Sequence, residues 1–347
     1  MLYLVLFPFL LSLIFLLIGV NLAQRFGLVD SPDARKIHTG RVPLVGGLSI
    51  FLGGWIGVFF LTNSQPTEIF YLFLLSFFIL VTGIYDDRYG LTPRIKLTFQ
   101  FLISAFLIFK TVLWFNNFEI SAFSESIFSD TYFLIFLTLF FYIGAINSLN
   151  MIDGVDGLAG GFALITIVML MFVSYNSGMY DVSAILAIFS ASIIPFLFCK
   201  LCVCGKKKQI YLGDSGSMFL GLFLTFFMIY LSQESSVEKS SLNFGFHTSL
   251  WFFAVPISDT LFVIIKRLIN GESPFNADRN HLHHILLNKH GKGKTLLIIF
   301  SLTLVLDFFG LLLSYYHVSQ LYNLIIFTLF LLVFLMFMSK FSNIDVH

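Results

Sequence analysis

Long apolar runs alternate with short polar segments along almost the whole chain. About eleven of these runs reach the roughly 20 residues that a helix needs to cross a hydrocarbon core of about 30 Å. They cover approximately residues 2–22, 43–62, 69–85, 96–115, 131–149, 158–175, 182–198, 215–232, 248–265, 295–314 and 321–339. The shorter alternating pattern that is typical of outer-membrane barrels is absent. The chain is therefore predicted to be an all-α, polytopic integral membrane bundle of about eleven transmembrane helices.

Composition agrees with this prediction. Of the 347 residues, 58% are hydrophobic and 11% are charged, and 46 are Phe. A water-soluble fold could not bury that much apolar surface. The first run lacks a basic start and a small-residue cleavage site, so we interpret it as a retained span rather than a signal peptide. Residues 1–347 are predicted to form one integral membrane domain.

The basic residues predict the orientation of the bundle. With the N-terminus outside, all of the 20 Lys and Arg residues except Lys110 and Lys239 fall in inner loops, at inner span ends or in the C-terminal tail. This asymmetry is the positive-inside pattern. We therefore expect an outside N-terminus and a cytoplasmic C-terminus. The net charge of +1 gives no indication of nucleic-acid binding.

Three cysteines, Cys199, Cys202 and Cys204, lie together at the inner end of the run 182–198. A reducing cytosol disfavours a disulfide there. The spacing C-x-x-C-x-C raises the alternative of a metal site, but the sequence supplies no fourth ligand nearby. Packing is therefore the preferred interpretation.

Five inner loops concentrate the chemically distinctive residues. Their sequences are SPDARKIHTGRVPLVGG, YDDRYGLTPRIK, NMIDGVDGLAGG, GKKKQIYLGDSGS and KRLINGESPFNADRNHLHHILLNKHGKGK. We predict that they build a functional site from the segments at about 24–47, 85–96, 150–161, 199–217 and 266–294. Because the clustering is one-sided, it indicates a cytosolic substrate that meets the bilayer.

Asp86 and Asp87 follow directly on the apolar run 69–85. Two adjacent carboxylates repel each other, and a divalent cation or the nearby Arg88, Arg94 and Lys96 would relieve that repulsion. A solvated helix end is the alternative interpretation.

Asn150, Asp153 and Asp156 recur at intervals of three residues, so a helix starting here would place them on one face. Three oxygen-bearing side chains suit a hydrated cation or a nucleotide. The twelve-residue spacing and terminal Glu of an EF-hand are missing. A glycine-rich turn with a capping Asp is the alternative, but it accounts for one acid rather than two.

Asp214 lies in the segment LGDSGS that opens the apolar run 215–232. Free N–H groups at a helix start attract phosphate, and a carboxylate there can bind a hard cation. The spacing of a Walker A loop is absent. An N-capping Asp is the alternative.

Arg279, His281, His283 and His284 form a basic cluster in the last inner loop. The spacing of His281 and His284 is compatible with zinc, but no closed set of four ligands follows from the sequence. Beside a magnesium ion these residues would instead hold phosphates or stabilise charge. A solvated basic loop is the alternative.

Two acids, Asp259 and Asp307, lie within apolar runs. A carboxylate at such a depth costs about 2.5–3.5 kcal/mol on insertion scales, so each is a functional hypothesis. Asp259 could line the same inner cavity as the loops, whereas the sequence identifies no partner for Asp307.

Acids for a metal, basic groups for phosphates and a membrane scaffold together suit phosphoryl transfer to a lipid. The five loops, in this order, also resemble those of the polyprenyl-phosphate N-acetylhexosamine-1-phosphate transferases, the superfamily that includes phospho-MurNAc-pentapeptide translocase. The resemblance runs from residue 30 to about residue 290. It is closest to the bacterial undecaprenyl-phosphate N-acetylglucosaminyl-1-phosphate transferases.

This resemblance implies a Mg2+-dependent enzyme, with Mn2+ as an alternative cation, in the bacterial cytoplasmic (inner) membrane and with its active site facing the cytoplasm. Such an enzyme transfers GlcNAc-1-phosphate from UDP-GlcNAc to undecaprenyl phosphate and releases UMP. The product begins O-antigen, enterobacterial common antigen or a related cell-surface glycan. The implied partners are these two substrates and the lipid bilayer, and a homodimer is left open.

The resemblance also implies residue roles. The metal ligands would be Asp214 and Asp87, and the catalytic residues Asp86, Asp87, Asp153 and His281. The substrate-binding residues would be Asn150, Asp156, Arg279, His283, His284, Lys36 and Arg41, with Asp156 nearest the uracil. We expect direct attack by the lipid phosphate, because no residue stands out as a dedicated nucleophile.

Two departures from the pentapeptide-using branch favour the simple amino-sugar branch. The loop TGRVPLVGG replaces that branch's K-x-G-T-P-T-M-G-G, and H-L-H-H replaces three consecutive histidines. The first departure gives Lys36 and Arg41 less support than the other motif residues have.

The sequence leaves two alternative functions open, of which only the second belongs to another class of protein. The same chemistry could use UDP-GalNAc, UDP-MurNAc-pentapeptide or a bacillosamine-type donor. An ion-coupled transporter or lipid flippase would also use membrane acids, but it would place them near the membrane midplane. Here the acids gather at one interface, which disfavours a transporter.

Overall fold

A computed structural model gives the fold of residues 2–30, 40–62, 66–116, 130–203, 210–234, 242–274 and 280–342. In these residues it contains twelve α-helices, a π-helical turn and two short strands. The helices are α1 (Leu2–Phe26), α2 (Gly46–Leu61), α3 (Thr67–Tyr89), α4 (Pro93–Thr111), α6 (Thr131–Ile152), α7 (Leu158–Asn176), α8 (Tyr180–Phe198), α9 (Gly213–Glu234), α10 (Phe246–Phe252), α11 (Ala254–Ile269), α12 (Leu282–Tyr315) and α13 (Gln320–Ser342). The π-helical turn η1 (Cys199–Val203) continues α8.

The predicted all-α, polytopic membrane fold is confirmed. Among the described residues, eight helices are long and apolar enough to cross a membrane: α1, α3, α6, α7, α8, α9, α12 and α13. The three other predicted runs correspond to α2, which has 16 residues, to α4, which contains Arg94, Lys96 and Lys110, and to the pair α10 and α11. Each predicted run thus has a helical counterpart, while the number of crossings stays a prediction.

The run 248–265 differs from its prediction, because it forms two helices bent by 78° rather than one straight span. The break falls at Phe253, whose backbone angles of −112° and 14° are not helical. Pro256 follows in the first turn of α11, where its missing N–H is tolerated. In the interior of a single long helix the same proline would remove a backbone hydrogen bond, so the chain starts a new helix instead.

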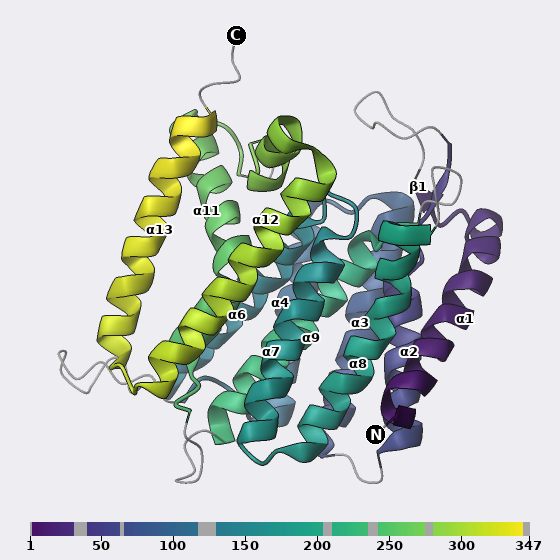
Figure 1. The fold of residues 1–347 in the computed structure, drawn as a ribbon, viewed down its shortest axis with the longest axis horizontal. Helices are drawn as coiled ribbons and strands as arrows, with labels where there is room; N and C mark the ends of the chain where they lie inside the picture. The colour runs from purple at the N-terminus through teal and green to yellow at the C-terminus, as the bar shows by residue number, and fades with distance from the viewer. Residues whose placement is uncertain are drawn as a thin grey trace.

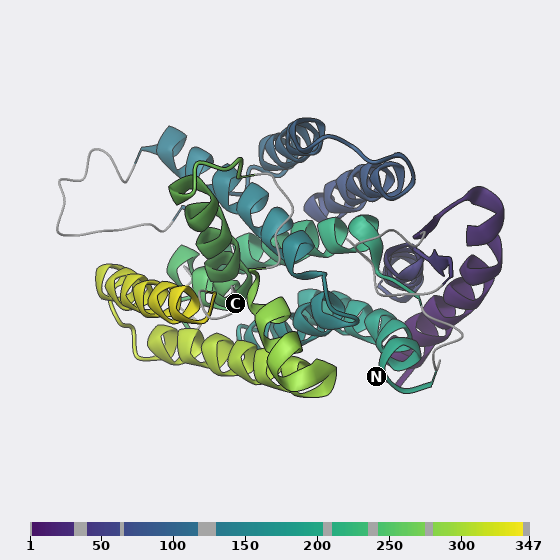
Figure 2. The ribbon, with the colours of Figure 1, turned by 90° about the horizontal axis from the view of Figure 1, so that it is seen from above.

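Helix α9 forms the centre of the bundle and is almost completely buried. Seen from above, it runs through the middle, with α3 and α4 on one side and α7 and α8 on the other (Figure 2). Aromatic side chains fill the space around it: the ring centroid of Phe223 lies 4.2 Å from that of Phe189 and 5.8 Å from that of Phe219. This packing fixes where α9 begins, at Gly213 and Asp214.

A small strand pair closes one corner of the bundle next to the start of α9. Strands β1 (Val29–Asp30) and β2 (Val42–Pro43) pair antiparallel, with Val29 opposite Pro43. Tyr211 joins this corner, because its N–H donates to the carbonyl of Pro43 at 2.9 Å and its carbonyl accepts from the N–H of Gly46 at 3.0 Å. The first inner loop is therefore tied to the loop that precedes α9.

The helix ends that carry the predicted functional loops lie at one end of the bundle. Helix α1 begins at the opposite end, and α13 ends on the same side as these loops (Figure 1). The two ends of the chain thus lie on opposite sides, as the predicted orientation requires. Which side faces the cytoplasm stays a prediction.

Candidate active site

A cavity of about 740 Å³ opens at the end of the bundle where the inner loops meet. All five segments expected from the sequence contribute to its walls, which include Asp30, Leu44, Asp87, Asp153, Asp156, Phe196, Lys200, Tyr211, Asp214, His284 and Lys292. Residues that are far apart along the chain therefore face a common space.

The first acidic group joins the end of α3 to the start of α9 through a lysine of α4. The Nζ atom of Lys96 donates to Oδ2 of Asp214 at 2.6 Å and forms an ion pair with Oδ2 of Asp86. Lys96 thus supplies the cation expected to relieve the repulsion between neighbouring acids. Arg88, another candidate for that role, lies over the ring of Tyr89 instead.

Asp87 holds the beginning of α9 in place. Its two carboxylate oxygens accept the backbone N–H groups of Asp214 at 2.8 Å and of Ser215 at 3.2 Å. These N–H groups belong to the first turn of α9, where they have no carbonyl partner within the helix. The helices can approach this closely because Gly83 of α3 lies against the backbone of Ser215, where a Cβ atom would overlap it. Asp87 therefore both lines the cavity and positions Asp214.

Asn150 also contacts the first turn of α9. Its Nδ2 atom donates to Oγ of Ser217 at 2.9 Å, and that hydroxyl is 3.3 Å from the carbonyl oxygen of Gly213. The end of α6 is thus connected to the start of α9, next to the two acids of the same loop.

The second acidic group contains Asp153 and Asp156, which both line the cavity. Asp156 forms two ion pairs, with Nζ of Lys200 at 2.7 Å and with Nζ of Lys292 at 2.9 Å. Burial raises the pKa of Asp153 well above its usual value, and the carboxylate of Asp214 raises it further. Asp156 is therefore paired with two cations, whereas Asp153 lies near another negative charge, that of Asp214.

Lys200 lies between a carboxylate and an aromatic ring. Its side chain is 2% exposed, and its Nζ atom is 3.9 Å from the ring centroid of Tyr211 in addition to its ion pair with Asp156. It sits on the π-helical turn η1, a distortion that often marks functional sites. Burial, and then the carboxylates of Asp156 and Asp30, raise the pKa of Tyr211 to about 12, so its hydroxyl stays neutral.

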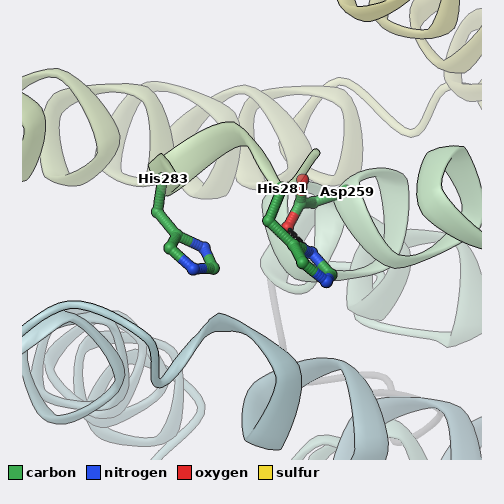
Figure 3. A group of neighbouring side chains, drawn as sticks. All are labelled: Asp259, His281 and His283. Atoms are coloured by element: carbon green, nitrogen blue, oxygen red, sulfur yellow. Dashed lines mark hydrogen bonds and ion pairs between the residues drawn. The ribbon is translucent and has the colours of Figure 1, made fainter. Parts of the chain in front are cut away.

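The basic loop meets the intramembrane acid Asp259. Nδ1 of His281 lies 2.8 Å from Oδ2 of Asp259, and Oδ1 of the same carboxylate accepts the N–H of Leu282 at 2.6 Å. Figure 3 shows this pair, with the ring of His283 beside it and nearly parallel to the ring of His281. Asp259, His281 and His283 offer ligand atoms within 4.8 Å of one another. The two oxygens of Asp259 contact His281 and Leu282 at the start of α12. This acid of α11 therefore holds the histidine loop in position.

The three histidines have different surroundings. His281 and His283 are buried, with ring centroids 5.4 Å apart, and His283 packs against Gly154 of the loop that carries the second acidic group. His284 lines the cavity itself. The histidine loop thus forms one side of the site. Of its three histidines, His284 is the one that lines the cavity.

Several residues singled out in the sequence lie elsewhere. Lys36 and Arg279 are outside the described residues, and Arg41 is exposed. Cys199 packs in a small apolar cluster with Leu16, while the side chains of Cys202 and Cys204 lie outside the described part of the chain. Asp307 is buried, and neither of its carboxylate oxygens has a hydrogen-bond partner among the described residues.

Sequence reasoning did not single out Lys200, Lys292 or Tyr211, although all three line the cavity. The one feature of the sequence that pointed to them is that they lie inside the predicted functional segments 199–217 and 266–294. That feature did not distinguish them, because the positive-inside pattern alone accounts for lysines in an inner loop.

The donor set at the cavity fits a hard divalent cation. The carboxylates of Asp87, Asp153 and Asp214 line the same cavity, and oxygen atoms are the ligands that Mg2+ prefers. Lys96 forms an ion pair with Asp214, so a positive charge already lies against this carboxylate. The residues present therefore suit the magnesium ion expected from the sequence.

Comparison with known proteins is consistent with this geometry. The sequence profile described as "Glycosyl transferase family 4" matches residues 69–232. A Yersinia pestis protein named undecaprenyl-phosphate alpha-N-acetylglucosaminyl 1-phosphate transferase is 30% identical over 86% of this chain and 80% of the relative. A protein of the same name from Escherichia coli O157:H7 is 28% identical over 95% of this chain and 88% of the relative.

A more distant organism has a similar protein. In Bacillus subtilis strain 168, a probable undecaprenyl-phosphate N-acetylglucosaminyl 1-phosphate transferase is 31% identical over 77% of this chain and 72% of the relative. The similarity to the Escherichia coli protein extends over nearly the whole chain.

Proposed function

The chain belongs to glycosyl transferase family 4, and on this basis we propose that it transfers N-acetylglucosamine-1-phosphate from UDP-GlcNAc to undecaprenyl phosphate. The products are undecaprenyl-diphosphate-GlcNAc and UMP. This lipid-linked sugar begins a cell-surface glycan, such as O-antigen or enterobacterial common antigen.

The observation that carries the proposal is the position of the cavity. Its walls combine acids suited to a metal, cations suited to phosphates and an aromatic ring, and it opens at the ends of membrane-length helices. A water-soluble nucleotide-sugar and a lipid phosphate can meet at such a boundary, whereas a transporter would need its acids near the midplane.

The nucleotide end of the donor binds beside Asp156 in this proposal. Lys200 and Lys292 fix the position of that carboxylate, and Tyr211 adds an aromatic surface next to it. His284, which lines the cavity, and Arg279 contact the diphosphate and the sugar, while the buried His281 and His283 support the histidine loop. Asp259 holds the start of that loop through His281.

In the transfer step, an oxygen of the lipid phosphate attacks the phosphorus that carries the sugar. The bond from this phosphorus to the bridging oxygen breaks, and UMP leaves with the electron pair. Bound Mg2+, held by Asp214 and Asp87, would neutralise charge on the diphosphate. Asp153 suits the role of proton acceptor for the lipid phosphate, because its carboxylate lines the cavity and burial raises its pKa, which makes it more basic. Asp86 keeps Lys96 against this group of acids.

The membrane orientation is part of the same proposal. The protein lies in the bacterial cytoplasmic membrane with the cavity facing the cytoplasm, where UDP-sugars are made. The basic residues around the cavity support this orientation through the positive-inside pattern.

The test is transfer by the purified protein in detergent, with undecaprenyl phosphate and labelled UDP-GlcNAc, followed as UMP release and lipid-linked label. We expect activity with Mg2+, loss of activity in EDTA and recovery when Mg2+ is restored. Asp214→Asn should lower the rate by about 100-fold or more, because it removes a charge that stabilises the transition state. Parallel reactions with UDP-GalNAc and other UDP-sugars test the donor.

Two results would contradict the proposal in different ways. Transfer from another UDP-sugar without transfer from UDP-GlcNAc would leave the chemistry intact and change the donor. Full activity of Asp214→Asn, or of the parent protein in EDTA, would remove the metal assignment.

A further inference from the structure

Lys96 occupies a position that is unusual for a lysine in a site expected to bind a metal. Its ammonium group touches two carboxylates at once, Asp86 on α3 and Asp214 on α9, although it comes from a third helix. Helix α4 begins at Pro93 after the capping residue Thr92, so Lys96 lies in its first turn. This start of α4 brings the lysine into the gap between α3 and α9.

The charge around Lys96 is unbalanced. Asp86 and Asp214 share the single ammonium group of Lys96, and Asp87 lies beside them with its oxygens on N–H groups of α9. Asp153 lies close enough for Asp214 to affect it electrostatically. Asp156 differs, because it has cations of its own in Lys200 and Lys292. Lys96 thus compensates a group of acids whose total charge exceeds its own.

A divalent cation would compete with Lys96 for the same carboxylate. Oδ2 of Asp214 accepts the ammonium group at 2.6 Å, and a magnesium ligand must approach the metal to about 2.0–2.1 Å. Two cations on one carboxylate oxygen repel each other. Lys96 and the metal are therefore alternative partners of Asp214.

We propose that Lys96 is an internal counter-ion that compensates Asp86 and Asp214 in the metal-free protein and releases Asp214 when a divalent cation binds. This inference rests on the proposed metal dependence and adds a residue that sets metal affinity. The side chain is suited to the exchange, because it is flexible and 21% exposed, whereas Asp86 is 5% exposed and stays in place. After the exchange Lys96 keeps Asp86 as its partner.

The experiment measures Mn2+ binding to the purified protein in detergent by electron paramagnetic resonance, with no substrate present. In Lys96→Met, Mn2+ should bind about tenfold more tightly than in the parent, because the competing charge is gone. Lys292→Met is the matched control: it removes another cation of the same cavity, one that pairs with Asp156 rather than Asp214, and should change the dissociation constant less than twofold.

Thermal unfolding supplies a second readout on the same proteins. Lys96→Met should melt at a lower temperature than the parent in EDTA, since its acids are uncompensated. Mn2+ should then raise its melting temperature by more than it raises that of the parent, because a ligand that binds more tightly stabilises the folded protein more.

A third measurement needs no variant, so it decides the question even if Lys96→Met does not fold. Amine-reactive labelling of the parent protein, read by mass spectrometry, should modify Lys96 faster after Mg2+ is added, with Lys292 unchanged.

Three outcomes would overturn the inference: an unchanged or weaker Mn2+ affinity in Lys96→Met, an equal gain in Lys292→Met, or labelling of Lys96 that does not respond to Mg2+. In each of these the parent protein still binds the metal, so the proposed function stands. Absence of Mn2+ binding to the parent itself would instead remove the metal assignment, and this inference with it.

Discussion

Asp153 and Asp156 lie three residues apart, yet their surroundings shift their pKa values in opposite directions. Burial raises the pKa of Asp153, and the carboxylate of Asp214 adds to the effect. Burial also acts to raise the pKa of Asp156, but the ammonium groups of Lys200 and Lys292 outweigh it, and the pKa falls below its usual value. In this short loop, the negative charge of Asp153 destabilises the folded protein, whereas the negative charge of Asp156 stabilises it.

These opposite shifts predict opposite effects of two matched substitutions on the stability of the metal-free protein. For Asp153, the unfolded chain loses its proton near the usual pKa of 3.8 and the folded protein at a higher pH, so stability falls as the pH rises through that window. Asp153→Asn stays neutral, so it should be more stable than the parent at about pH 8. Its advantage should shrink toward about pH 5.

For Asp156, stability is fully present above 3.8 and is lost when the pH falls through the lowered folded pKa. Asp156→Asn should therefore melt below the parent, by a similar difference at about pH 5 and about pH 8. Both comparisons use thermal unfolding in detergent with EDTA. If Asp153→Asn is less stable than the parent at about pH 8, the negative charge of Asp153 does not destabilise the folded protein.

The acids of this site could be located from the sequence more readily than their cations. The sequence indicates a functional role for Asp86, Asp153 and Asp214. These acids lie at the ends of apolar runs, and it is unfavourable to place a carboxylate in or near the membrane. It gives no such indication for the lysines, since an inner loop is expected to be basic whatever its function. The pair of Lys200 with Asp156 depends on how η1 packs beside the loop after α6, which is a tertiary fact that no local pattern contains.

At the scale of elements, apolar length predicted where helices lie but not where they break. A chain in lipid must satisfy its own backbone hydrogen bonds, so every long apolar run becomes helical. The break between α10 and α11 lies inside an apolar run with similar residues on both sides, and Pro256 was its one local signal. The N-terminal part of α12, which carries the histidines, was likewise expected as a loop and is helical.

Helix α12 has its own break, at Gly291, which separates the histidine segment 282–290 from the long segment that follows. The backbone angles of Gly291 are 73° and 169°, a region that is essentially restricted to glycine. Directly after the break, Lys292 reaches Asp156. The geometry of this one residue therefore sets how the histidines and Lys292 approach the cavity together.

Gly291→Ala should weaken both stability and transfer. The added Cβ meets open space, so the effect comes from backbone strain, at about 1–3 kcal/mol, rather than from a steric clash. We expect kcat/KM for UDP-GlcNAc to fall by about tenfold as the break relaxes and displaces the segment. Gly293→Ala is the matched control two residues away, since its Cβ also meets open space and its φ is not positive. Equal effects of the two substitutions in the transfer assay would argue against the break as the cause.

At the scale of the whole molecule, the chemistry is concentrated at one end of an otherwise apolar bundle. The cavity, both acidic groups and the histidine loop all lie where the inner loops meet, and the far end carries short connections such as the one between α7 and α8 (Figure 1). The order of helices in the chain brings the five loops of the site back to the same side, as an antiparallel succession of spans does. The fold class and the gathering of the functional loops at one end of the bundle could thus be predicted together, because both follow from the spacing of apolar runs.

The same arrangement predicts which native residues a membrane-impermeant reagent can reach in intact cells. If the cavity faces the cytoplasm, Cys202 and Cys204, which follow α8 in the chain, should stay unlabelled by an impermeant maleimide until the cells are permeabilised, whereas Cys199 is buried. Leu2→Cys at the start of α1 and Asn176→Cys at the end of α7 should be labelled without permeabilisation, because both lie at the opposite end and are exposed. Labelling of the native cysteines in intact cells, with protection of both introduced ones, would mean that the bundle is inverted. Labelling of Asn176→Cys with protection of Leu2→Cys would mean that α1 does not cross the membrane with the other helices.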